Sequence, residues 1–225
     1  MTLPVPQLPR LLHLTDSALP TGAFAYSYGL ESSLTFGLIA DEAAFRGYLY
    51  SCLQQVAGFE LPFVAGAAQA TAAELETLMS EYDAQLLVPT LHRTSLAQGN
   101  SWLRLLSAFY PAAGLAELGA ELARRALPTH FAPLFGFTLG RVGFTAAEIQ
   151  PAFLHLALRD QVSAAIRLGF IGPLAGHRLQ HEFYGVFEEL LAAVPATYGE
   201  ALRCTALLDV AQMLHEEVYS RLFQN

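Results

Sequence analysis

The chain has 225 residues, of which 53% are hydrophobic, and its formal net charge is −8. This length fits one domain with a single extended core, and the negative charge argues against nucleic acid or an anionic membrane surface as partners. The charge-free stretches, such as residues 47–59 and 126–140, are too short or too interrupted by Pro and Gly to span a bilayer.

No basic segment precedes an apolar run near the N-terminus, so we expect no signal peptide. Cys52 and Cys204 lie far apart without metal-ligand spacing, which fits reduced thiols in a cytoplasmic protein. The surplus of apolar residues is then best explained by contacts with other protein chains.

Helix signals dominate in chain order. Ala- and Leu-rich segments predict helices from Asp41 to about Gln69 with a bend at Pro62, from Glu74 to about Ser107, and from Ala146 to about Leu168. Capping boxes are predicted at helix starts at Thr71–Glu74, Thr145–Glu148 and Thr197–Glu200. There is no sustained strand-like alternation and no hairpin turn signal. We therefore predict an all-α, single-domain multi-helix bundle of roughly eight to ten helices.

The predicted helix from Ala146 is apolar around most of its circumference, which is typical of a helix buried in a bundle or between subunits. Its apolar residues are Ile149, Phe153, Leu154, Leu156, Leu158, Val162, Ala165 and Ile166. Its polar residues gather late, at Arg159, Asp160, Gln161, Ser163 and Arg167. Periodicity favours a central core helix with a polar end, and the alternative is a buried hydrogen-bonded patch at an interface.

Ser27 lies in Ala25-Tyr26-Ser27-Tyr28-Gly29, which approximates the nucleophile elbow of α/β-hydrolases. That elbow needs a preceding strand, whereas the Pro and Gly residues here predict a loop that leads into a helix. The sequence therefore disfavours a serine hydrolase and predicts no catalytic residue.

His177 and His181 are four residues apart, so both rings lie on one face of a predicted helix and could share a nickel or zinc ion. Two ligands form an incomplete site, so no metal site is predicted, and a nickel-binding metallochaperone stays as an alternative. The remaining histidines show no ligand spacing: His13, His92, His130, His155 and His215. Without a lysine the chain has no P-loop, so any GTP chemistry belongs to a partner.

The segment from Asp16 to Glu31 closely resembles the N-terminal region of the urease accessory protein UreF family. The residues that fit its pattern are Leu19, Pro20, Gly22, Phe24, Ser27, Gly29, Leu30 and Glu31. Residues 61–65, 162–168 and 219–223 resemble three further family stretches. The chain departs from the family at residues 169–173, where Pro-Leu-Gly-Gln is common, and at Gln224-Asn225, where Arg-Ser is frequent.

The resemblance implies an all-α protein that forms a complex with UreD (also called UreH) and the GTPase UreG and acts on apo-urease as a homodimer. It implies a scaffold and regulator of GTP-dependent nickel insertion, not an enzyme, with no cofactor of its own. The expected partner-binding residues are Leu19, Pro20, Gly22, Phe24, Ser27, Gly29, Glu31, Arg167, Arg221, Leu222 and Phe223.

Residues 1–15 and 214–225 are expected to be mobile partner-binding ends. We expect Val218, Leu222 and Phe223 to share one side of the C-terminal segment and to dock on UreD. For Ser17–Glu31 two interpretations stay open, namely a backbone approached closely by a partner and a rigid turn packed on the core.

Overall fold

The computed structural model describes residues 6–203 and 205–224, and every regular element within these ranges is helical. Cys204, Asn225 and residues 1–5 of the predicted mobile N-terminal end lie outside the described residues. The predicted all-α fold is confirmed. The α-helices are α1 Gln7–Leu14, α2 Leu30–Thr35, α3 Glu42–Gln55, α4 Leu61–Gln69, α5 Ala72–Gln85, α6 Pro89–Phe109, α7 Leu115–Arg124, α8 Phe131–Arg141, α9 Ala146–Arg167, α10 Pro173–Phe183, α11 Phe187–Ala192 and α12 Ala206–Met213.

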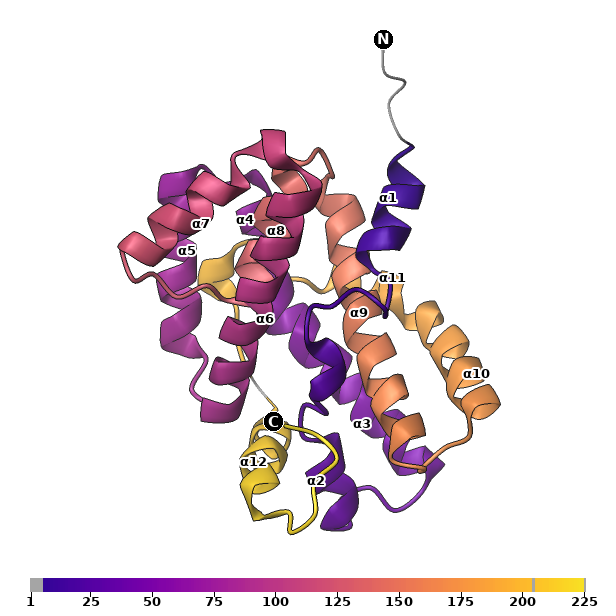
Figure 1. The fold of residues 1–225 in the computed structure, drawn as a ribbon. Coiled ribbons are helices and arrows are strands. Elements are labelled where there is room, and N and C mark those ends of the chain that lie inside the picture. The colour runs from indigo at the N-terminus through magenta and orange to yellow at the C-terminus, as the bar shows by residue number, and fades with distance from the viewer. Residues whose placement is uncertain (1–5, 204, 225) are drawn as a thin grey trace.

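Helix α9 is the centre of the fold (Figure 1) and packs against α2, α3, α4, α8, α10 and α11. Its predicted apolar residues are buried, apart from the half-buried Ile166. The capping box at Thr145 forms, since its backbone N–H donates to the Glu148 carboxylate over 2.8 Å. The prediction of a central core helix is therefore confirmed. No helix in the described part of the chain is long and apolar enough to cross a membrane.

Two predicted segments differ in the structure. The predicted helix from Glu74 to Ser107 is two helices, α5 and α6, because Pro89 begins α6 and holds the preceding Val88 in an extended conformation. The capping box at Thr71 forms, but the one predicted at Thr197 is wrong. Tyr198–Glu200 is a single 3₁₀ turn that ends at an extended Ala201.

The predicted bend at Pro62 has a structural counterpart. A π-helical segment, Val56–Glu60, joins α3 to α4 directly before this proline. Pro62 has no N–H to donate to the carbonyl of Gly58, four residues back. That carbonyl accepts the N–H of Leu202 instead, over 3.0 Å. The helix irregularity thus provides an attachment point for the C-terminal part of the chain.

A half-buried charged cluster adds a second attachment. Arg203 hydrogen-bonds Asp209 at the start of α12, and its Nη1 lies 3.7 Å from Glu60 Oε1. Burial raises the pKa of Glu60 to about 7, and the nearby Arg203 opposes this shift only in part. The segment that leads to α12 is therefore held to the core by groups whose charge depends on pH.

Helices α4 and α8 pack so closely that at two positions of α8 there is no room for a side chain. A Cβ atom on Gly136 would lie 2.1 Å from the carbonyl oxygen of Val64, and one on Gly140 would lie 2.1 Å from that of Ala68. These glycines are four residues apart and lie on the same face of α8. They let two helix backbones come into contact in the core.

Gly136→Ala should therefore destabilise the protein by about 1–3 kcal/mol, because the added methyl group pushes α8 away from α4. The matched control is Gly47→Ala on the exposed side of α3, where a Cβ meets no atom within 4 Å. We expect that control to be stabilised by up to about 1 kcal/mol. Urea unfolding measures both free energies, and equal stability of the two variants would contradict the close packing.

Glu60 should also make stability depend on pH. Its folded pKa of about 7 lies above the ordinary value of 4.5, so its contribution is complete below pH 4.5 and is lost as the pH rises through 7. In Glu60→Gln the free energy of unfolding should fall less over this range than in the unaltered chain. Urea titrations at pH 5, 6, 7 and 8 test this, and parallel profiles would refute it.

Candidate partner-binding site

The loop from Asp16 to Gly29, called the N-terminal loop below, joins α1 to α2. Gly22 and Gly29 both have φ values of +88°, a left-handed conformation that favours glycine. A Cβ on Gly22 would meet nothing within 4 Å, but one on Gly29 would lie 2.7 Å from Gln212 Cγ of α12. The predicted loop leading into a helix is thus present, and its end packs against the C-terminal part of the chain.

The expected partner-binding residues of this loop divide into two groups. Pro20, Gly22 and Phe24 are exposed and Leu19 is half-buried, whereas Ser27, Gly29 and the adjoining Glu31 are buried. The first half of the segment is therefore accessible to a partner, and the second half is an internal turn. The rigid turn packed on the core describes the second half, and close approach of a partner to the exposed first half stays a prediction.

Ser27 is completely buried. Its hydroxyl accepts the N–H of Glu31 over 3.4 Å, and its carbonyl accepts Gln161 Nε2 over 3.2 Å. No strand precedes it in the part of the chain that the structure describes. This is the environment of a structural hydroxyl at a helix start, and it gives a substrate no access to the oxygen, so it offers no support for the hydrolase alternative.

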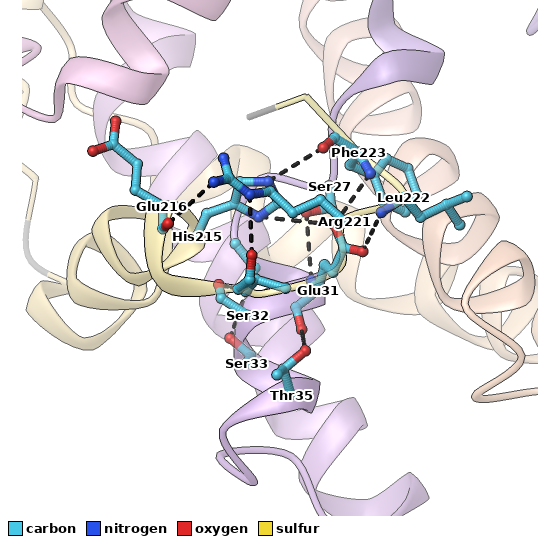
Figure 2. A network of polar contacts seen from close by, with 12 residues as sticks. Ser27, Glu31, Ser32, Ser33, Thr35, His215, Glu216, Arg221, Leu222 and Phe223 are labelled. Carbon is cyan, nitrogen blue, oxygen red and sulfur yellow. Dashed lines mark hydrogen bonds and ion pairs between the residues drawn. The ribbon is translucent and has the colours of Figure 1, made fainter.

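The carboxylate of Glu31 binds the C-terminal tail, defined here as residues 214–224 (Figure 2). It is 5% exposed and accepts the backbone N–H groups of Leu222, over 2.6 Å, and Phe223, over 3.1 Å. One further bond runs from the N–H of Gln224 to the carbonyl of Ala25, over 2.8 Å. The tail is thereby attached to both α2 and the N-terminal loop.

His215 lies beneath this junction and is completely buried. Its Nε2 contacts the carbonyl of Phe223 over 3.3 Å, and its Nδ1 lies 3.8 Å from Glu31 Oε2. Burial lowers the pKa of His215, although the contacts with Phe223 and Glu31 oppose this. A neutral ring can still donate Nε2–H to the carbonyl and so supports the turn of the tail.

Arg167, the last residue of α9, connects the loop and the tail from the other side. Its guanidinium carbon lies 3.5 Å from the centre of the Phe24 ring and 4.3 Å from that of the Phe223 ring, and the group also donates to the Phe24 carbonyl. Cation–π contacts with two rings hold an arginine in place more firmly than one exposed contact does. The sequence pattern did not reveal this pairing.

The polar end of α9 holds the N-terminal loop at other points as well. Arg159 donates to the carbonyl of Thr15 over 2.5 Å and is paired with Asp160, and Gln161 donates to Ser27. These hydrogen bonds lie within the chain, against Thr15 and the N-terminal loop. A hydrogen-bonded patch at an interface, the alternative from the sequence, stays a prediction.

The tail differs from the expected segment with its apolar residues on one side. Val218 and Phe223 are buried, but Leu222 is 53% exposed and Tyr219 is completely exposed, so the three predicted apolar residues do not share one face. Arg221 is exposed and donates to the carbonyls of Val218 and Glu216, closing the turn after residues 214–217. The predicted mobility of the two ends stays a prediction.

Apolar side chains are exposed around this junction. Leu207, Val210 and Met213 are spaced three apart on α12 and are 64%, 42% and 49% exposed, while Phe24 of the loop is 66% exposed. Helix α12 packs on α2 at the end of the molecule that also carries the C-terminus (Figure 1). Exposed apolar side chains concentrated on one end of a protein mark an interaction site.

The predicted histidine pair does not gain further ligands. His177 and His181 are exposed on α10, and the neighbouring Glu182 forms an ion pair with Arg46 over 2.7 Å. Among the described residues, the potential ligands that converge in a group of three are Asp83, His92 and His130. Sequence spacing missed this group, because it forms only when three separate segments pack together.

The fold and this junction define an all-helical protein with exposed apolar side chains around the junction. The UreF family model matches residues 39–184. Urease accessory protein F of Oryza sativa subsp. indica is 35% identical over 217 residues, which cover 93% of this chain and 82% of the relative. UreF of Arthrobacter sp. (strain FB24) is 30% identical over 225 residues, which cover 96% of each chain. The chain belongs to the UreF family of urease accessory proteins.

Replacing the Glu31 carboxylate with an amide should loosen the tail. Glu31→Gln turns one acceptor into a donor that faces a backbone N–H, at a cost of about 1.5 kcal/mol or more. Amide hydrogen exchange at Leu222 and Phe223 should therefore become about ten times faster or more. Glu188→Gln, at an exposed position on α11, is the control. Unchanged exchange in Glu31→Gln would contradict the assigned role of this carboxylate.

Proposed function

We propose that this protein acts in urease maturation as a scaffold in a cytoplasmic complex with UreD (UreH) and UreG. In that complex it assists GTP-dependent nickel insertion into apo-urease, with nickel as cargo. The observation that supports this role best is the junction of N-terminal loop and tail, which keeps apolar side chains exposed on a rigid support. The relatives named as urease accessory proteins supply the process in which such a surface is used.

The surface offered to UreD consists of the tail and the exposed half of the N-terminal loop. Leu222 projects from a backbone that Glu31 fixes, and Phe24 is stacked on Arg167. Side chains held in place before binding lose little conformational freedom on association, which favours affinity. The apolar face of α12 extends the contact area at the same end of the molecule.

The proposal includes a regulatory role toward UreG. The chain has no lysine and therefore no P-loop of the Gly-x-x-x-x-Gly-Lys form, so in this proposal UreG carries out the hydrolysis of GTP. We also propose that the protein is a homodimer within the complex. Leu8 and Leu12, which are four residues apart on α1 and 66% and 62% exposed, provide an apolar contact separate from the tail.

Leu222→Asp should abolish co-purification with UreD, because a charge is buried in the contact and left without a partner. Leu174→Asp is the matched control, since this leucine is 76% exposed at the start of α10. Deleting all residues after Glu217 is a less specific test, because it also removes the buried Phe223.

Leu222→Asp and Leu174→Asp are compared in three measurements. These are the capture of UreD, the mass of the complex by light scattering, and the GTPase rate of UreG in the presence of the complex. We expect Leu222→Asp neither to bind UreD nor to change the GTPase rate of UreG. Its helicity by circular dichroism should be unchanged. Equal UreD capture by Leu222→Asp and the control would overturn the assigned surface. A UreD complex with a single copy of this chain would refute the homodimer.

A further inference from the structure

A second polar cluster, made of side chains other than those of the loop and tail, lies where three segments converge. Asp83 is near the end of α5, His92 is in the first turns of α6, and His130 directly precedes α8. Asp83 Oδ1 lies 2.7 Å from His92 Nε2 and 2.9 Å from His130 Nε2. The two imidazole rings are nearly perpendicular, at 80°, with centres 4.9 Å apart. Two imidazole nitrogens thus point at one carboxylate oxygen.

The local fold fixes this convergence. Val88 and Pro89 turn the chain between α5 and α6, so that α6 starts beside the end of α5. On α6, a Cβ on Gly99 would lie 1.8 Å from the carbonyl oxygen of Thr129. Only a glycine lets the chain before α8 lie directly on α6, and this contact delivers His130 to the other two side chains.

The surroundings suit a bound cation on one side and water on the other. The His130 side chain is completely buried, whereas those of His92 and Asp83 are 33% and 39% exposed. The imidazole of His130 is thus shielded from solvent, and the cluster is open to water on the side of His92 and Asp83.

Ser95 provides the outer support that metal-bound histidines require. Its Oγ lies 3.1 Å from His130 Nδ1 and accepts the N–H of Phe131 over 3.2 Å. When Nε2 of His130 coordinates an ion, the ring proton is on Nδ1. The Nδ1–H group can then donate a hydrogen bond to this hydroxyl oxygen, which fixes the ring orientation. Without an ion the hydroxyl can donate to Nδ1 instead, so Ser95 is compatible with both forms.

We propose that Asp83, His92 and His130 bind one divalent first-row transition-metal ion, with water completing its coordination. Two imidazoles and one carboxylate form a donor set that suits zinc and nickel and that magnesium does not favour. Metal–ligand bonds near 2.1 Å separate tetrahedral ligand atoms by about 3.4 Å. The observed separations of 2.7 and 2.9 Å therefore have to widen by about 0.5–0.7 Å, which the partly exposed His92 and Asp83 allow.

The three proposed ligands are different side chains from those of the proposed contact with UreD. It also differs from the exposed pair His177 and His181, which no third ligand joins within the described residues. Replacing that pair therefore serves as the control, because it measures any metal binding by exposed histidines outside the proposed site.

Isothermal titration calorimetry of the full chain with Zn²⁺, Ni²⁺ and Mg²⁺ tests the proposal. We expect one Zn²⁺ or Ni²⁺ per chain and no measurable Mg²⁺ binding. His92→Ala and Asp83→Asn should each weaken binding at least tenfold, an effect of the size seen when metal sites are altered. The double variant His177→Ala/His181→Ala should bind as the unaltered chain does. Circular dichroism confirms that each variant is folded, and the buried His130 is left unaltered.

Nitrogen-15 NMR of the histidine rings identifies the ligand atoms directly, since Zn²⁺ should shift Nε2 of His92 and His130. The proposal is overturned if no Zn²⁺ or Ni²⁺ binds, if His92→Ala and Asp83→Asn bind as tightly as the unaltered chain, or if only the double variant loses the ion. In each of these cases the three side chains form a hydrogen-bonded cluster that holds α5, α6 and α8 together without a metal.

Discussion

The junction of the N-terminal loop and the tail depends on the buried carboxylate of Glu31. This carboxylate accepts two consecutive backbone N–H groups of the tail. A buried carboxylate is costly unless it is well hydrogen-bonded or near a positive charge, and here both conditions hold, because Arg167 interacts with it electrostatically. Residues almost two hundred positions apart are thereby joined into one surface.

Other features of the fold converge on the same junction. Helix α9 carries Arg167 and Gln161 to the N-terminal loop, and Gly29 lets α2 pack against α12. On its way to α12 the C-terminal segment is attached to the core, because the N–H of Leu202 donates to the Gly58 carbonyl, to which Pro62 has no N–H to donate. A rigid base with exposed Leu222 and Phe24 is the kind of surface that a scaffold protein offers a partner.

Much of the helical fold could be predicted from the sequence, because its signals are local. The Ala146–Arg167 helix follows from its apolar periodicity and its capping box. The break at Val88 could have been found from Pro89, since the residue before proline avoids the helical conformation. The failure at Thr197 is different, because a threonine and a glutamate three residues apart are compatible with both a helix and a single 3₁₀ turn.

The candidate site could be predicted only in part. The family pattern identified Glu31, Arg167 and Phe223 one by one, but their mutual contacts depend on tertiary packing between distant segments. The cluster of Asp83, His92 and His130 has no regular spacing for the same reason.

The central claim is that the N-terminal loop and the tail form the surface that binds UreD. The most direct measurement of it is hydrogen–deuterium exchange of the chain alone and bound to UreD. The account predicts added protection in residues 16–31 and 206–224 on binding, and protection confined to other regions would contradict it.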